Sequence, residues 1–203
     1  MGAVSKEQPK SPQARLFVAL DLPSPVRESI ADWGKGELVD PALRTVRPES
    51  LHITLAFLGN RPEQEIERIA TVVGECGAPA PLIELSGPVA RPPRGRPRLF
   101  ALAALSPGAE AMQAQLSEAL AAASLYEPEK RAFWPHVTLA RVRPEGRGSR
   151  RPRAIVRPPK QLPPSLSEAF YGVRLTLYRS ELQPSGARYV PLAQVELPGA
   201  GRQ

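Results

Sequence analysis

The chain has 203 residues, 42% of them hydrophobic, a formal net charge of +7, two histidines and a single cysteine. This length suits one domain, or one pair of related lobes, with a substantial core; a single cysteine excludes an intramolecular disulfide framework and fits a reducing compartment. The histidines and the cysteine are too few for a recognisable metal cluster, and no stretch approaches a secretory signal or the ~20 consecutive apolar residues of a membrane span. We therefore expect a cytoplasmic protein that has no membrane association, holds no metal and uses no cofactor. The positive charge favours polyanionic partners but does not identify one.

Apolar runs of strand length alternate with helical patterns along the chain. In chain order we expect a strand over 16–20, a helix over 24–33, a short strand over 43–46, a strand over 51–58, a helix over 62–76, strands over 82–89 and 99–105, a helix over 111–125, and strands over 136–142, 170–182 and 189–197. Ser24-Pro25 and Ser106-Pro107 each match an N-cap followed by a first helical residue. Gly34 and Gly36 are expected to end the first helix, and Gly59-Asn60 to end the third strand.

Two segments are rich in arginine and proline. Residues 91–98 are expected to form a basic loop, and residues 143–164 a long exposed loop with room for a short strand near 154–156. Besides Arg143, the arginines of the longer segment are Arg147, Arg150, Arg151, Arg153 and Arg157. Such loops either steer a nucleic-acid backbone toward a cleft or form a solvated surface, and composition leaves both interpretations open.

Both histidines of the chain lie in copies of one short motif. The copies are Leu51-His52-Ile53-Thr54-Leu55 and Pro135-His136-Val137-Thr138-Leu139, and they use two of the five threonines. Because alternate residues of a strand point to the same face, each strand presents an imidazole beside a hydroxyl and buries the residue between them. The element order gives each motif strand its own helix-bearing half, which favours a two-lobed α+β protein with a cleft between its sheets.

Two imidazoles are the usual means of cleaving a phosphodiester without a metal ion. One takes a proton from the attacking nucleophile and the other gives a proton to the leaving oxygen, while hydroxyls and a basic side chain hold the non-bridging oxygens. We therefore predict that His52 and His136 are catalytic and that Thr54 and Thr138 bind phosphate. Arg141 is a further phosphate candidate. Its odd offset from His136 places it on the opposite face of an ideal strand, so contact requires a twist, a bulge or a strand end. The residues alone do not say which histidine is the acid.

The histidines and the aromatic residues also have structural interpretations. A lone histidine in an apolar strand is usually a satisfied core or surface residue, but two copies of one motif that use every histidine favour catalysis. Trp134, beside the second motif, is the candidate for stacking on a terminal base. Phe17 and Phe57 are expected in the core, since both lie in apolar runs.

The motifs and their flanks resemble the two-histidine phosphoesterase superfamily and, within it, the RNA 2′,3′-cyclic phosphodiesterase family, also called 2′-5′ RNA ligases. The segments that carry the resemblance are residues 15–23, 51–59, 133–141, 176–180 and 188–189. It implies a bilobal, pseudo-symmetric α+β fold in which two antiparallel sheets flank a central cleft with helices outside. We expect this fold to form one domain over residues 15–197, between a disordered tail over 1–14 and a short tail over 198–203.

The resemblance also implies an activity. It is metal-independent hydrolysis of a 2′,3′-cyclic phosphate at an RNA terminus to a 2′-phosphate, with the reverse 2′-5′ joining of RNA ends. The family pattern assigns His52 as proton donor and His136 as proton acceptor, an RNA with a cyclic phosphate terminus as the partner, and a monomer with no obligate protein partner. The dense arginines over 143–159 depart from the family and leave substrate preference open. The alternatives are a 2′-5′ oligonucleotide or small cyclic-nucleotide phosphodiesterase, and an RNA-binding module without turnover.

Overall fold

The structure, a computed structural model, describes residues 11–183 and 186–199. In this part of the chain, strands outnumber helices, and three short 3₁₀ turns join some of them. The strands are β1 (Gln13–Asp21), β2 (Leu43–Thr45), β3 (His52–Pro62), β4 (Leu82–Arg91), β5 (Leu99–Leu105), β6 (His136–Val142), β7 (Phe170–Tyr171), β8 (Arg174–Gln183) and β9 (Gly186–Glu196). The helices are α1 (Ser24–Glu37), α2 (Ile66–Glu75) and α3 (Pro107–Ala122).

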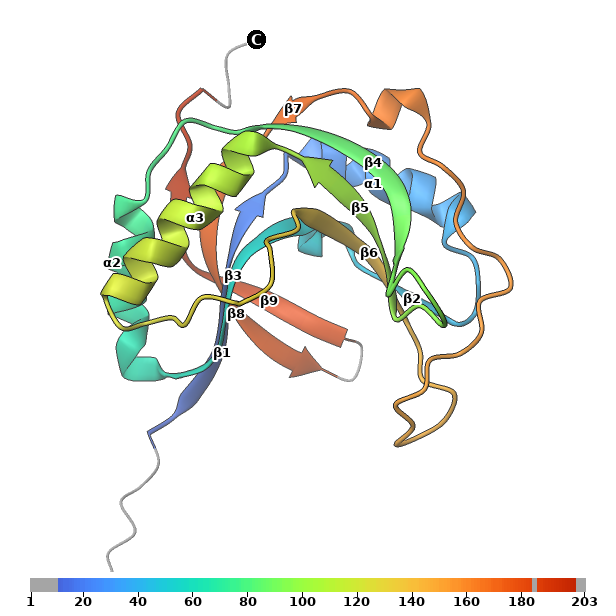
Figure 1. Ribbon diagram of the computed structural model, residues 1–203, viewed down its shortest axis with the longest axis horizontal. Helices are drawn as coiled ribbons and strands as arrows, with labels where there is room; N and C mark the ends of the chain where they lie inside the picture. Colours follow the sequence, from blue (N-terminus) through green and yellow to red (C-terminus); the bar gives the residue numbers. More distant parts are fainter. Residues whose placement is uncertain (1–10, 184–185, 200–203) are drawn as a thin grey trace, which may run out of the picture.

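The strands form one antiparallel sheet in the order β7-β4-β5-β6-β3-β1-β8-β9, with β2 paired to β6. Figure 1 shows that this sheet is strongly curled, with α2 and α3 side by side on one face. The α+β class and the antiparallel pairing are confirmed. The two expected sheets are the two halves of this single sheet, because β3 and β6 pair at its centre through Ile53 and Val137. Both motif strands therefore lie next to each other in the middle of the sheet.

Most expected elements are present, and the differences have local causes. The first helix continues through Gly34 and Gly36 to Glu37, and the amide of Leu38 closes it on the carbonyl of Gly34. Its N-cap residue is Pro23, because Ser24 is already the first helical residue; the Ser24 hydroxyl accepts a hydrogen bond from the Arg27 guanidinium and caps no amide.

Strand ends also differ from expectation. β3 does not stop at Gly59 but runs to Pro62, because Gly59 adopts a φ of 72° beside a bulge and the ladder with β1 continues beyond it. β1 begins at Gln13, inside the expected tail over 1–14, whose first ten residues lie outside the described residues. The expected strand over 170–182 is divided into β7 and β8. No strand forms near 154–156 in the described structure.

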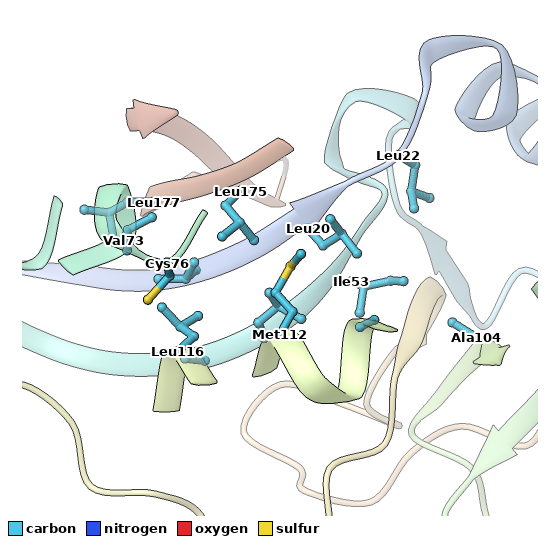
Figure 2. Packing of buried hydrophobic residues seen from close by; sticks show 14 of the residues in the cluster. Leu20, Leu22, Ile53, Val73, Cys76, Ala104, Met112, Leu116, Leu175 and Leu177 are labelled. Carbon is cyan, nitrogen blue, oxygen red and sulfur yellow. The ribbon is translucent and has the colours of Figure 1, made fainter. Parts of the chain in front are cut away.

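The main hydrophobic core lies between the sheet and the pair α2 and α3. Figure 2 shows leucines of β1 and β8 and Ile53 of β3 facing Val73 and Cys76 of the α2 segment and Met112 and Leu116 of α3. The N-cap expected at Ser106 is confirmed: its Oγ accepts a hydrogen bond from the amide of Ala109 at 3.1 Å, and α3 begins four residues before the expected start at 111. This core fixes the inner side of both motif strands, so their other side is left for the site.

Candidate active site

The two histidines begin the two central strands, and their strands alternate as expected up to the threonines. Ile53 and Val137 are fully buried in the core, while His52, Thr54 and their counterparts in β6 are half-buried on the opposite face. The register pairs Ile53 with Val137. The two imidazole–hydroxyl pairs therefore flank the same central junction.

Both imidazoles are held in the same way. Nδ1 of His52 lies 2.8 Å from the carbonyl oxygen of Ser50, and Nδ1 of His136 lies 2.8 Å from the carbonyl oxygen of Trp134, two residues upstream in each case. A carbonyl oxygen only accepts, so Nδ1 carries the proton in both rings and Nε2 is the reactive nitrogen. Nε2 of His52 lies 3.1 Å from Oγ1 of Thr54, whose hydroxyl donates to it when the ring is neutral.

Aromatic rings fix the planes of both imidazoles. His52 stacks on Phe17, with centroids 5.1 Å apart, and Tyr189 meets it edge-on at 5.4 Å. His136 stacks on Trp134 at 4.2 Å with an interplanar angle of 11°. The Arg91 guanidinium lies over the same Trp134 ring at 4.0 Å. The tryptophan predicted to stack on a base thus already stacks on a histidine.

Burial governs the protonation of both histidines. It lowers the pKa of His52 to about 4, against a smaller opposing effect of the Ser50 carbonyl and the Asp21 charge. Burial also lowers the pKa of His136, and nearby arginines lower it further. Both rings are therefore neutral at pH 7 in the free protein. An anion bound between them would raise both pKa values, because its charge favours the imidazolium form.

Two matching bulges decide which later residues face the site. The extra residue is Leu55 in β3, opposite β1, and Leu139 in β6, opposite β5. Each bulge inverts the alternation, so two consecutive residues are buried and the residue five after each histidine is exposed on the site face. These residues are Phe57 and Arg141. The bulge that Arg141 needed to reach the site is present.

A buried carboxylate lies behind His52. Asp21, 4% exposed, is the residue opposite His52 in the ladder between β1 and β3. Its carboxylate accepts hydrogen bonds from Arg174 Nε at 3.0 Å, from the Thr176 hydroxyl at 2.8 Å and from the Tyr178 hydroxyl at 2.9 Å. Burial and the Asp21 charge raise the pKa of Tyr178 to about 12, so this hydroxyl remains a donor. The network ties β1 to β8 directly behind the first imidazole.

A cavity of about 330 Å³ opens on the site face. Four of the predicted residues line it, namely His52, Thr54, Thr138 and Arg141. His136 and Trp134 lie beside this cavity and not in its wall. The wall also contains residues that sequence reasoning did not assign to a site: Arg15, Phe17, Arg44, Phe57, Ser180 and Tyr189.

Phe57 was expected in the core and that expectation is wrong. It is 42% exposed, and the Arg15 guanidinium lies 4.9 Å from its ring centroid. The sequence carried one signal for this: Leu-Ala follows the threonine in both motifs, so two apolar residues in succession mark the bulge before Phe57 and Arg141. Phe17 is buried as expected, yet its ring face contacts the imidazole of His52.

The described residues contain no helix with the length and apolar character of a membrane span. Nor do they contain a group of three or more histidine, cysteine, aspartate or glutamate side chains placed to hold a metal ion.

Comparison with known proteins places this chain in a family. The profile of the 2′-5′ RNA ligase superfamily matches residues 22–181. The chain belongs to this superfamily. Among its relatives, the RNA 2′,3′-cyclic phosphodiesterase of Thermus thermophilus is 32% identical over 91% of this chain and 91% of its own length. The enzyme of the same name from Escherichia coli is 28% identical over 88% of this chain and 93% of its own length.

Two solved structures have the same fold as this chain. The crystal structure of TT0787 of Thermus thermophilus superposes with a TM-score of 0.73 at 29% identity, covering 91% of this chain and 98% of that one. The crystal structure of Escherichia coli LigT complexed with 3′-AMP gives a TM-score of 0.70 at 27% identity, covering 92% and 99%. The superfamily membership expected from the paired motifs is confirmed over nearly the whole chain.

Proposed function

We propose that the protein hydrolyses the 2′,3′-cyclic phosphate at an RNA terminus to a 2′-phosphate, without a metal ion. The observation that carries this proposal is the matched pair of imidazoles. Each has Nδ1 bound to a backbone carbonyl, which leaves Nε2 reactive, and each lies on a strand with a threonine two residues later. Relatives that align along most of the chain are named RNA 2′,3′-cyclic phosphodiesterases, which supports the same activity here.

The two imidazoles handle the two protons of the reaction. His136 accepts a proton from water as the water oxygen bonds to phosphorus. His52 donates a proton to the 3′ oxygen as the bond between that oxygen and phosphorus breaks, which leaves the phosphate on the 2′ oxygen. Thr54, Thr138 and Arg141 bind the non-bridging oxygens and stabilise the charge that develops on them. Because each proton has a donor and an acceptor of its own, the sequence of steps balances without a metal.

The low pKa of His52 fits its role as an acid only when substrate is bound. A histidine with a pKa of about 4 is neutral at pH 7. The anionic cyclic phosphate beside Nε2 raises this pKa, so the ring takes up its proton as the substrate enters. His52 is therefore protonated only when a substrate with a leaving oxygen is bound.

Ligation is the same ring opening with an RNA hydroxyl in place of water. The 5′-hydroxyl of a second RNA end gives its proton to His136 as its oxygen bonds to phosphorus. The bond between phosphorus and the 3′ oxygen breaks as His52 protonates that oxygen, which leaves a 2′-5′ bond. The RNA partner, the monomeric state and the cytoplasmic location belong to this proposal.

Base stacking on Trp134 stays a prediction: its ring contacts His136 and Arg91, so a base would have to displace the Arg91 guanidinium. Phe57 offers an exposed ring in the cavity wall.

The direct test uses a short RNA that ends in a 2′,3′-cyclic phosphate, incubated with the protein in excess chelator. We expect a 2′-phosphate product, and we expect His52→Ala or His136→Ala to lower kcat by about a hundredfold or more. Thr138→Ala should lower it less, and Thr71→Ala on α2 is the matched control that leaves it unchanged. A cyclic end that survives, or opens equally well in both histidine variants, contradicts the proposal. Activity that disappears with chelator shows a metal site instead.

A second substrate assigns the acid. Sulfur in place of the 3′ oxygen makes a leaving group that departs without a proton. This substrate should restore most of the rate lost in His52→Ala and none of that lost in His136→Ala. If the sulfur substrate restores the rate of His136→Ala alone, then His136 is the proton donor and His52 is the proton acceptor. Linear 2′-5′ oligonucleotides and nucleoside 2′,3′-cyclic phosphates, tested in parallel, measure the competing substrate classes.

A further inference from the structure

A second cavity of about 350 Å³ adjoins the first at the start of the loop that follows β6. Its wall is strongly basic. The arginines that line it are Arg44 of β2, Arg141 of β6, and Arg143, Arg147 and Arg153 of the loop. Figure 1 shows this loop projecting from the end of β6 beside β2, on the side away from α2 and α3.

These five guanidinium groups have no carboxylate partner in the described part of the chain, where no salt bridge includes any of them. Arg143 and Arg153 each donate through Nε to a backbone carbonyl, at 3.3 and 3.2 Å, which orients the side chain and leaves the outer nitrogens available. The acidic residue of the loop, Glu145, is bound instead to Arg96 and Arg151. The cavity therefore holds uncompensated positive charge.

The loop is built to hold its shape. Pro144 and Pro152 form an isolated bridge, and the amide of Glu145 donates to the carbonyl of Arg151 at 2.9 Å. Farther along, the buried carboxylate of Asp40 accepts hydrogen bonds from two successive amides, that of Val156 at 2.7 Å and that of residue 157 at 2.9 Å. Asp40 lies between α1 and β2, so this connecting segment anchors the long exposed loop that the sequence predicted.

The two cavities share part of their walls. Arg44 and Arg141 line both, and they are paired residues in the ladder between β2 and β6. The second cavity therefore continues from Arg141, the residue that is proposed to bind the terminal phosphate.

We propose that the second cavity binds the phosphodiester group that precedes the terminal nucleoside of the same RNA strand. This inference rests on the proposed function for the identity of the strand, and it names the substrate class as an oligonucleotide, not a nucleoside cyclic phosphate. Arginine is the residue best suited to a phosphate, because its planar fork donates two parallel hydrogen bonds to two oxygens. Among the arginines that line the second cavity alone, Arg147 is exposed and has no ion pair or side-chain hydrogen bond in the described part of the chain, so its fork is open to such a contact.

The test compares two product-like ligands that differ by one phosphate, adenosine 2′-monophosphate and adenosine 2′,5′-bisphosphate, by calorimetry at fixed salt. We expect the bisphosphate to bind about tenfold more tightly, the effect of one charge-assisted contact in a solvent-open site. Arg147→Ala should remove most of this advantage. Arg150→Ala, which removes the same charge from the same loop outside the cavity, should keep it.

Three results overturn the proposal: equal affinity for the two ligands, an advantage that survives Arg147→Ala, or an equal loss in both variants, which would show general attraction only. A matching comparison of kcat/KM for a nucleoside 2′,3′-cyclic phosphate with and without a 5′-phosphate should give the same preference. If this protein opens no cyclic phosphate, the proposed function is refuted. The calorimetric comparison still decides whether the cavity binds the second phosphate.

Discussion

The depressed pKa of His52 predicts a specific loss of stability in acid. Burial in the folded protein lowers this pKa from 6.5 to about 4, whereas in the unfolded chain it returns to about 6.5. Between these two values the unfolded state binds the proton and the folded state does not, so folding weakens as the pH falls. The penalty is absent well above pH 6.5, grows below it and is complete below about pH 4.

The size of the effect follows from the same two pKa values. Linkage gives a penalty of about 2 kcal/mol at pH 5 and almost none at pH 7. Protonation of carboxylates such as Asp40 also destabilises the folded protein in acid. The pKa of Asp40 is lowered mainly by the hydrogen bond from the Arg157 amide. The contribution of His52 therefore has to be isolated by comparison with His52→Gln, which cannot titrate.

Urea unfolding of both proteins at pH 5, 6 and 7 provides the measurement. The free energy of unfolding should fall from pH 7 to pH 5 by about 2 kcal/mol more in the wild type than in His52→Gln. NMR titration is the independent check, since the chain has only two histidines. The His52 signal should titrate near pH 4, and the pKa that it reports should rise when phosphate is added. Equal pH dependence of the two proteins, or a His52 pKa near 6.5, would refute the argument from burial.

Other parts of the structure give further predictions. Leu116→Ala opens a cavity between α3 and the sheet and should lower the free energy of unfolding by about 3 kcal/mol in urea, whereas Leu105→Ala, at a site 59% exposed, should change it by less than about 0.5 kcal/mol. A loss below about 1 kcal/mol in the first variant would mean that this part of the core repacks. Ser106→Ala removes the N-cap of α3 and should cost about 1 kcal/mol by the same assay; no change would show that water replaces the cap. Asp40→Asn places an amide donor against backbone amides, so hydrogen exchange at the Val156 amide should accelerate markedly. Unchanged protection of this amide would show that Asp40 does not stabilise the loop.

The sequence alone was sufficient for the features that depend on local pattern. Alternation placed Ile53 and Val137 in the core and the histidines on the other face, because side-chain direction in a strand follows the chain itself. Helix α3 and its cap at Ser106 were predicted for the same reason, since a capping side chain acts on amides of its own first turn. The paired motifs also predicted the superfamily and the residue types of the site.

Tertiary structure decided what depends on neighbours far along the chain. The bulges that bring Phe57 and Arg141 to the site exist only relative to the partner strands β1 and β5, so an ideal strand pattern places both residues on the wrong face. The low pKa of His52 likewise comes from burial under rings of other strands. Arginines of one loop look alike in sequence, yet Arg151 is bound to Glu145 while Arg147 lines a cavity. Ladder register, burial and charge pairing are non-local quantities, and they determine which residues surround each motif.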